Sequence, residues 1–201
     1  MSKLHLKRAV ERSEGGPMNA AAISVALLPH PSDPSPVVEA VECVLEPQDH
    51  FWSLRYCARD GGDLLVPAPV GAGHADGLWR HTCFELFVAT PSASSYREFN
   101  FSPSGQWACY AFTRYRERDP DFAPPPDAAP HIQVWRSADR LTLDVRLPRV
   151  LLPAGATEGP WRLGVSAVMA SQQGGIAHWA LCHPGPRPDF HARDALVLTL
   201  G

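Results

Sequence analysis

The chain has 201 residues, with 18 Lys and Arg against 21 Asp and Glu and a net charge of −3 at pH 7. This length fits one domain, and a nearly balanced charge without a long basic run argues against nucleic acid as a partner. No apolar run approaches the roughly 20 residues that span a bilayer, so we expect no membrane partner either.

The N-terminal segment imitates a secretory signal peptide, because Lys and Arg residues precede the apolar run 20–28. Gly15-Gly16-Pro17 interrupts this would-be leader, and Pro29 follows where the small residues of a cleavage site should stand. We therefore expect residues 1–17 to be a disordered extension, with Met18 as an alternative start, and residues 18–201 to form one domain.

Cysteine usage favours a reducing compartment. The five cysteines stand singly, with an odd count and no C-x-x-C pair, at Cys43, Cys57, Cys83, Cys109 and Cys182. This pattern predicts reduced, mostly buried thiols in a cytoplasmic protein.

Short segments with period-two alternation recur along the chain, each closed by Gly, Pro, Asp or Ser, and none has a sustained 3.6-residue apolar period. Strands are predicted, in chain order, over 23–28, 37–45, 51–58, 63–66, 83–88, 96–102, 106–113, 131–137, 141–147, 161–170, 176–182 and 195–200. The Pro-rich or Gly-rich segments 67–77 and 120–130 are predicted to be surface loops. The fold class is therefore all-β, an antiparallel β-sandwich of two packed sheets.

The segment 78–116 places polar side chains on one face of the predicted sheet. Glu85 alternates with apolar neighbours in one strand, and Glu98 and Asn100 alternate with Phe99 and Phe101 in the next. If the two strands pair, these three polar side chains stand together beside Tyr96. The sequence thus predicts a small polar platform on a rigid sheet.

Aromatic residues near these acids point to a saccharide as the small-molecule ligand. Indole faces stack on the apolar faces of sugar rings, and carboxylates and amides bind the hydroxyls. The candidate ligand-binding residues are Trp79, Glu85, Glu98, Asn100 and Trp179. Two alternatives stay open: each tryptophan is a core residue, as the patterns around Trp52 and Trp161 indicate, or Glu85 and Glu98 are a catalytic acid pair.

The C-terminal segment gathers histidines and aspartates that suit a metal. His178, His183 and His191 lie close in sequence to Asp189 and Asp194, which offers enough ligands for a divalent ion. No spacing among them matches a known zinc signature, so the metal site is an alternative hypothesis. Neither a phosphate-binding glycine loop nor a patterned nucleophile and base is present, and we expect no catalytic residue.

Three segments together, LWRHTCFELFVA, YREFNFSPSGQWACYAFTRYR and HWALCHPGPRPDFHARD, resemble the bacterial DOMON-like proteins related to family 9 carbohydrate-binding modules. The resemblance covers the chain from about Phe51 onward. It implies an immunoglobulin-like sandwich that binds sugars or haem on one sheet face without catalysis. Trp79 and Glu85 have the spacing of the first sugar-stacking tryptophan and its glutamate, and Trp179 is the candidate second wall.

The same resemblance implies a haem alternative. Haem-binding DOMON domains commonly use a methionine and a histidine as axial ligands, and here Met169 and His178 would form the pair if both face one cavity. The acids of the calcium site in the sugar-binding modules have no counterpart that we can assign. We expect a non-catalytic saccharide-binding module without a cofactor, and a haem- or metal-binding redox or hydrolytic protein is the alternative.

Overall fold

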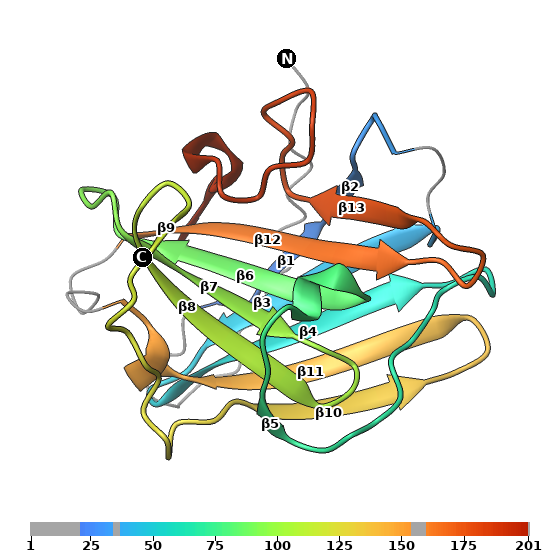
Figure 1. Cartoon of the computed structure of the whole chain (residues 1–201), viewed down its shortest axis with the longest axis horizontal. Coiled ribbons are helices and arrows are strands. Elements are labelled where there is room, and N and C mark those ends of the chain that lie inside the picture. The colour runs from blue at the N-terminus through green and yellow to red at the C-terminus, as the bar shows by residue number, and fades with distance from the viewer. Residues whose placement is uncertain (1–20, 34–36, 154–159, 201) are drawn as a thin grey trace.

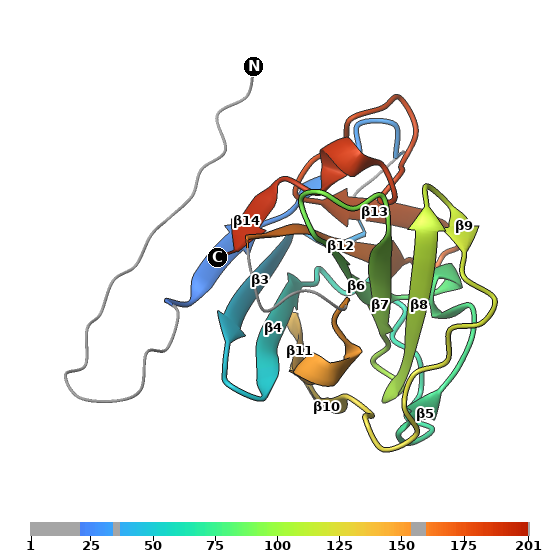
Figure 2. The same cartoon turned by 90° about the vertical axis from the view of Figure 1, so that its left-hand side faces the viewer.

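The computed structural model describes residues 21–33, 37–153 and 160–200. The first sheet has the strand order β1 (Ile23–Ala26), β3 (Ala40–Pro47), β4 (Phe51–Arg59), β11 (Arg140–Pro148) and β10 (His131–Arg136). The second has the order β2 (Leu28–Pro29), β13 (Ile176–Ala180), β12 (Trp161–Ala170), β6 (Cys83–Ala89), β7 (Tyr96–Phe101), β8 (Gln106–Arg114) and β5 (Gly73–His74). Two short strands join it, β14 (Leu198–Leu200) on β12 and β9 (Glu117–Arg118) on β8. The two sheets form separate layers, as Figures 1 and 2 show.

The predicted β-sandwich is confirmed. The pairings between neighbouring strands are antiparallel except that of β5 with β8. The predicted strand 63–66 forms only an isolated bridge between Leu64 and Ser171, and the two-residue strands β5 and β9 were not predicted. The predicted disordered segment 1–17 lies outside the described residues.

The space between the sheets is filled by the alternating apolar side chains of both layers. Trp52 on β4 and Trp161 on β12 are 1% and 5% exposed, and their rings meet edge to face at 5.4 Å, which confirms both as core residues. The Tyr56 hydroxyl also crosses this core and donates to the backbone carbonyl of Glu85 at 3.0 Å. This bond fixes β6 at the position that carries the polar platform on its other face.

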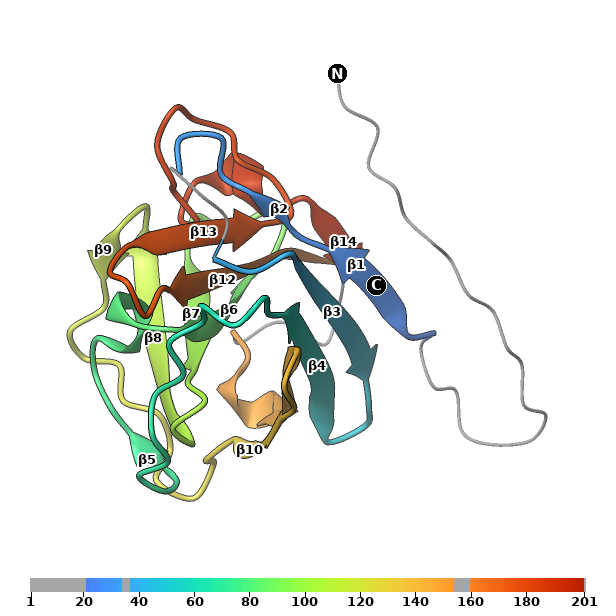
Figure 3. The ribbon, with the colours of Figure 1, turned by 90° about the vertical axis from the view of Figure 1, so that its right-hand side faces the viewer.

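The outer face of the second sheet is covered by the segment that follows β13. In Figure 3 this red segment arches above β13 and returns to β14. It carries η4 (Arg193–Ala195), and a second apolar cluster forms beneath it, in which Phe87, Tyr96 and Phe112 pack with Leu196. A sheet face that would otherwise be wet is therefore partly enclosed.

Two further expectations concern cysteines and the membrane. The five cysteines are unpaired; Cys43, Cys83 and Cys109 are buried, and Cys57 and Cys182 are partly buried. Burial raises the pKa of the Cys109 thiol to about 12, which keeps it protonated and unreactive.

Among the described residues, no helix has both the length and the apolar character needed to cross a membrane.

Candidate functional site

A pocket of about 350 Å³ opens on the outer face of the second sheet. Its walls come from six strands, from η1 (Leu78–Arg80) and from the segment after β13. The lining residues are Trp79, Glu85, Phe87, Glu98, Tyr110, Phe112, Arg116, Arg118, Val168, His178, Pro188, Phe190 and His191. Its volume lies within the range of about 300 to 1,000 Å³ typical of small-molecule sites.

Two glutamates form the acidic floor of the pocket. Phe84 and Leu86 point into the core, so strand alternation turns Glu85 to the outer face, and Glu98 on β7 is turned outward in the same way. Because Glu85 is in register with Asn100 and Glu98 with Phe87, the two carboxyls are diagonal neighbours on one face. They are only 2% and 4% exposed.

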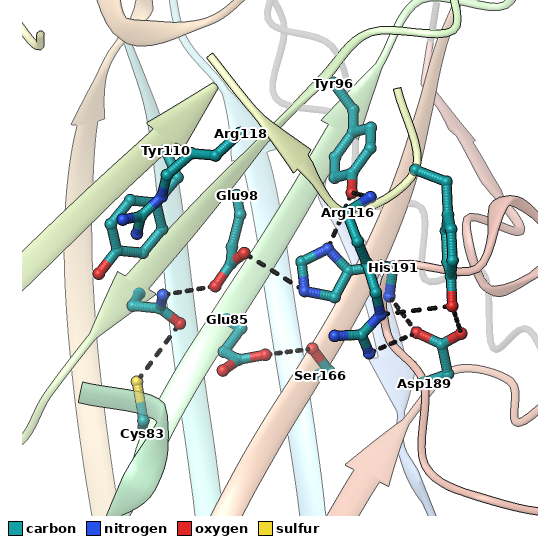
Figure 4. A network of polar contacts seen from close by, with 12 residues as sticks. Cys83, Glu85, Tyr96, Glu98, Tyr110, Arg116, Arg118, Ser166, Asp189 and His191 are labelled. Atoms are coloured by element: carbon teal, nitrogen blue, oxygen red, sulfur yellow. Dashed lines mark hydrogen bonds and ion pairs between the residues drawn. The ribbon is translucent and has the colours of Figure 1, made fainter. Parts of the chain in front are cut away.

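Neutral groups hydrogen-bond these carboxyls. The Ser166 hydroxyl donates to Glu85 Oε2 at 3.2 Å, and Asn100 Nδ2 donates to Glu98 Oε1 at 2.7 Å. Behind them, Cys83 Sγ lies 3.7 Å from Asn100 Oδ1. Figure 4 shows this chain of contacts running from Cys83 to Glu98, with Glu85 and Ser166 beside it.

Burial favours the protonated form of both floor carboxyls. Desolvation, reinforced by the neighbouring Glu98 charge, raises the pKa of Glu85 well above its ordinary value. Desolvation also raises the pKa of Glu98, although the Asn100 hydrogen bond and the more distant charges of Arg118 and Arg116 act in the opposite direction. A carboxyl that keeps its proton can donate as well as accept a hydrogen bond.

His191 connects the floor to the segment that covers the sheet. Its Nδ1 lies 2.8 Å from the Tyr96 hydroxyl, and its Nε2 lies 3.6 Å from Glu98 Oε2. Desolvation, followed by the charge of Arg116, lowers the pKa of His191 to about 4. Although Glu98 is close, its raised pKa means that the carboxyl is largely neutral at the pH at which the imidazole takes up its proton, so it compensates little of that charge.

Trp79 stands at the edge of the pocket on η1. This turn follows Gly77, which has φ +74° and suits a left-handed conformation. Trp79 is 47% exposed, and the Arg80 guanidinium lies over its indole at 4.9 Å. An exposed indole beside buried polar groups is available for stacking on a ligand.

The predicted platform is assembled except for Trp179. Trp79, Glu85 and Glu98 line the same pocket, whereas Asn100 is fully buried and acts through its hydrogen bond to Glu98. Trp179 is 3% exposed and belongs to the core between the sheets. The assignment of Trp179 as the second wall is therefore corrected: alternation along β13 turns His178 to the pocket and Trp179 away from it.

Of the three histidines of the metal hypothesis, His178 and His191 line the pocket. His183 does not line the pocket, and its Nε2 lies 2.9 Å from the Leu28 carbonyl oxygen. His178 Nδ1 instead lies 3.3 Å from Asp33. In the part of the chain that the structure describes, no group of three or more His, Cys, Asp and Glu side chains is arranged to hold a metal.

The proposed haem pair faces two different spaces. β12 and β13 are adjacent, but Met169 is in register with Ala177 while His178 is opposite Val168. Met169 is fully buried in the core between the sheets, and His178 lines the outer pocket. The condition that both side chains face one cavity is not met, so this assignment is corrected too.

Several residues that line the pocket were not predicted from the sequence to contact a ligand. Tyr110 and Arg116 appeared only within a segment that carries the resemblance. Arg118 and Phe190 carried no assigned role, and His191 was considered only as a metal ligand. The one available signal was the cluster of aromatic and charged residues at 110–118, but its strand β9 has only two residues and no periodicity to read.

Solved structures show what this fold is similar to. A candidate carbohydrate-binding protein from Bacteroides uniformis ATCC 8492 has a TM-score of 0.56 and 15% identity, covering 80% of this chain and 77% of its own. A family 9 carbohydrate-binding module from Caldicellulosiruptor kristjanssonii, at 9% identity and 87% coverage of this chain, has TM-scores of 0.52 in complex with cellotriose and 0.54 with glucose, covering 80% and 82% of those chains. No protein-family model matches the sequence, and no curated protein matches it significantly. At these identities the likeness establishes the fold.

Proposed function

We propose that the protein is a non-catalytic binding module that takes up a small saccharide in the pocket over β6 and β7. The observation that carries this proposal is the meeting of a half-exposed indole, Trp79, with two buried carboxyls, Glu85 and Glu98, in one pocket of about 350 Å³. A sugar ring offers apolar C–H faces and a ring of hydroxyls. The indole suits the first and the carboxyls suit the second.

The packing around the carboxyls supports ligand binding. Glu85 and Glu98 are each fixed by a hydrogen bond from a neutral partner, so their orientation is set before a ligand arrives, which lowers the entropic cost of binding. The fold-level neighbours add support, because the family 9 modules were solved with glucose and with cellotriose.

The test is calorimetric titration with D-glucose and cellotriose, comparing Trp79→Ala with a matched control. Trp135 on β10 is 50% exposed, close to the 47% of Trp79, but lies on the other sheet. We expect Trp79→Ala to weaken binding by about tenfold, as for loss of an aromatic stacking contact, and Trp135→Ala to leave it unchanged. Equal affinities in the two variants would contradict the assignment.

A second readout separates binding from catalysis by the Glu85 and Glu98 pair. Cellotriose is incubated with the protein, and the release of glucose is followed over hours. A binding module leaves the trisaccharide intact. Hydrolysis that is lost in Glu98→Gln would replace the proposal by the acid-pair alternative.

A further inference from the structure

Two arginines line the solvent-exposed mouth of the pocket, above its acidic floor. Arg116 lies in the turn before β9 and Arg118 lies in β9, and both line the pocket. Their side chains are 51% and 50% exposed, whereas the floor glutamates are almost fully buried. The pocket therefore has a guanidinium end that faces solvent and a carboxyl end that does not.

Arg118 is held flat and keeps most of its donors free. Its guanidinium lies 3.7 Å above the centre of the Tyr110 ring. Among the described residues, only Asp76 accepts a hydrogen bond from it, from Nη2 at 3.4 Å. Tyr110 completes the arrangement by donating to the same Asp76 oxygen at 2.7 Å. A guanidinium has five N–H donors, so this one is positioned with capacity for a ligand.

Arg116 lies in a strained turn and is held by several hydrogen bonds. Its φ is +55°, the single positive value at a non-glycine residue in the described ranges, and a non-glycine side chain in this region costs on the order of 1 kcal/mol. Its backbone N–H donates to the Tyr96 hydroxyl at 3.0 Å, and its Nη2 donates to Asp189 at 2.9 Å. The Tyr115 hydroxyl also binds Asp189, at 2.7 Å. These contacts stabilise the turn and hold Arg116 at the pocket wall.

The lining itself carries more positive than negative charge. Asp76 and Asp189, the carboxylates that hold the two arginines, do not line the pocket. Of the acids that do, Glu85 has a strongly raised pKa because of burial, which disfavours its charged form. Figure 4 shows the two guanidinium groups on either side of Glu98, with that of Arg118 over the Tyr110 ring. A ligand with a hydroxyl-rich end and an anionic end matches this polarity.

We propose that the saccharide bound here is anionic, a pyranose bearing a carboxylate or a phosphate, and that Arg116 and Arg118 bind its charged group at the pocket mouth. This inference rests on the proposed function. Planar guanidinium groups bind carboxylate and phosphate oxygens through paired, charge-assisted hydrogen bonds. The hydroxyls at the other end of the sugar would then reach Glu85 and Glu98.

The experiment compares four probes by calorimetry at low ionic strength: D-glucose, D-glucuronate, D-glucuronamide and D-glucose 6-phosphate. Glucuronamide has the shape of glucuronate without its charge. Because hydrogen bonds to charged groups contribute about twice as much as neutral ones, we expect at least one charged sugar to bind roughly tenfold more tightly than glucose. Glucuronamide should bind like glucose, and the charged probe with the higher affinity identifies the anion.

Arg118→Gln and a matched control test whether Arg118, at the pocket mouth, causes the tighter binding of charged sugars. Arg146 on β11 is exposed and lies over the Phe51 ring at 5.4 Å, so Arg146→Gln removes a similar stacked cation from the other sheet. Arg118→Gln should lower the ratio of charged-sugar to glucose affinity by about tenfold, Arg118→Lys should restore part of that ratio, and Arg146→Gln should not alter it. Thermal melting confirms that each variant is folded.

The outcomes separate this inference from the proposed function. If glucose and both charged sugars bind equally well, or if Arg118→Gln leaves their ratio unchanged, the anionic ligand is refuted while saccharide binding stands. If inorganic phosphate binds as tightly as glucose 6-phosphate, the mouth is a plain anion site and the inference is also overturned. If no sugar binds, the proposed function and the inference fail together.

Discussion

His191 should make the protein sensitive to mild acid. Its side chain is 16% exposed, and its pKa of about 4 in the folded state lies below the ordinary 6.5. Above pH 6.5 the imidazole is neutral in both the folded and the unfolded chain. Between pH 6.5 and 4 the unfolded chain binds the proton more readily, so the free energy of unfolding falls as the pH falls.

The expected loss follows from the size of the shift. At about 1.4 kcal/mol for each pH unit, a fall in pKa from 6.5 to about 4 corresponds to about 3 kcal/mol of stability lost between pH 7 and pH 4. Glu98 opposes this loss only to the extent that it is ionised, and its raised pKa limits that contribution. A loss of this size is a large share of the total for a small domain.

The assay is urea unfolding followed by tryptophan fluorescence at several pH values between 7.5 and 4, with free energies extrapolated linearly. His191→Gln keeps an acceptor for the Tyr96 hydroxyl but cannot titrate, so its stability should fall about 3 kcal/mol less than that of the wild type. His131→Gln, which removes an exposed histidine from β10, is the control. Parallel pH profiles for wild type and His191→Gln would refute the reasoning.

Three further predictions concern the floor, the tryptophans and one glycine. Because burial raises the Glu85 pKa, its stabilising contribution is present at low pH and lost as the pH rises through that pKa, so Glu85→Gln should lose less stability than wild type between pH 5 and 9; identical urea profiles would contradict this. Trp179→Ala should lower the free energy of unfolding by about 3 to 5 kcal/mol through a core cavity, but Trp79→Ala by about 1 kcal/mol or less, and similar losses would contradict the core placement. Gly105 and Gly62 have φ of +90° and +104°, but only at Gly105 would a Cβ meet backbone, 3.3 Å from Gly71. Gly105→Ala should therefore destabilise the fold by about 1 kcal/mol more than Gly62→Ala, and equal chemical-denaturation midpoints would argue against this steric account.

Local patterns were sufficient to predict most strands. Segments such as 141–147 alternate apolar and polar residues over several positions, and this period is a property of the strand itself. The strands that were not predicted are short. β5 and β9 have two residues each and are held by pairing with β8 rather than by any pattern of their own.

The residues of the candidate site also fall into two groups, those that local patterns placed correctly and those that they did not. Glu85, Glu98 and Asn100 were placed on one face correctly, because alternation and pairing of neighbouring strands decide it. Trp179 was misplaced although its strand was predicted, since alternation shows that His178 and Trp179 face opposite ways without showing which of the two faces the core. That choice depends on which side of the second sheet packs against the first.

The sequence by itself determined that this protein is a β-sandwich with a polar platform on its segment 83–101, because both features follow from periodicities within single strands and from the pairing of chain neighbours. Only the tertiary structure decided that the platform is enclosed. His191 meets Tyr96 across 95 positions and Asp189 meets Arg116 across 73, and contacts at such separations leave no periodic signal in the chain. The physical reason is that burial, and with it the shifted pKa values and the two-ended polarity of the pocket, depends on which distant segment covers the sheet.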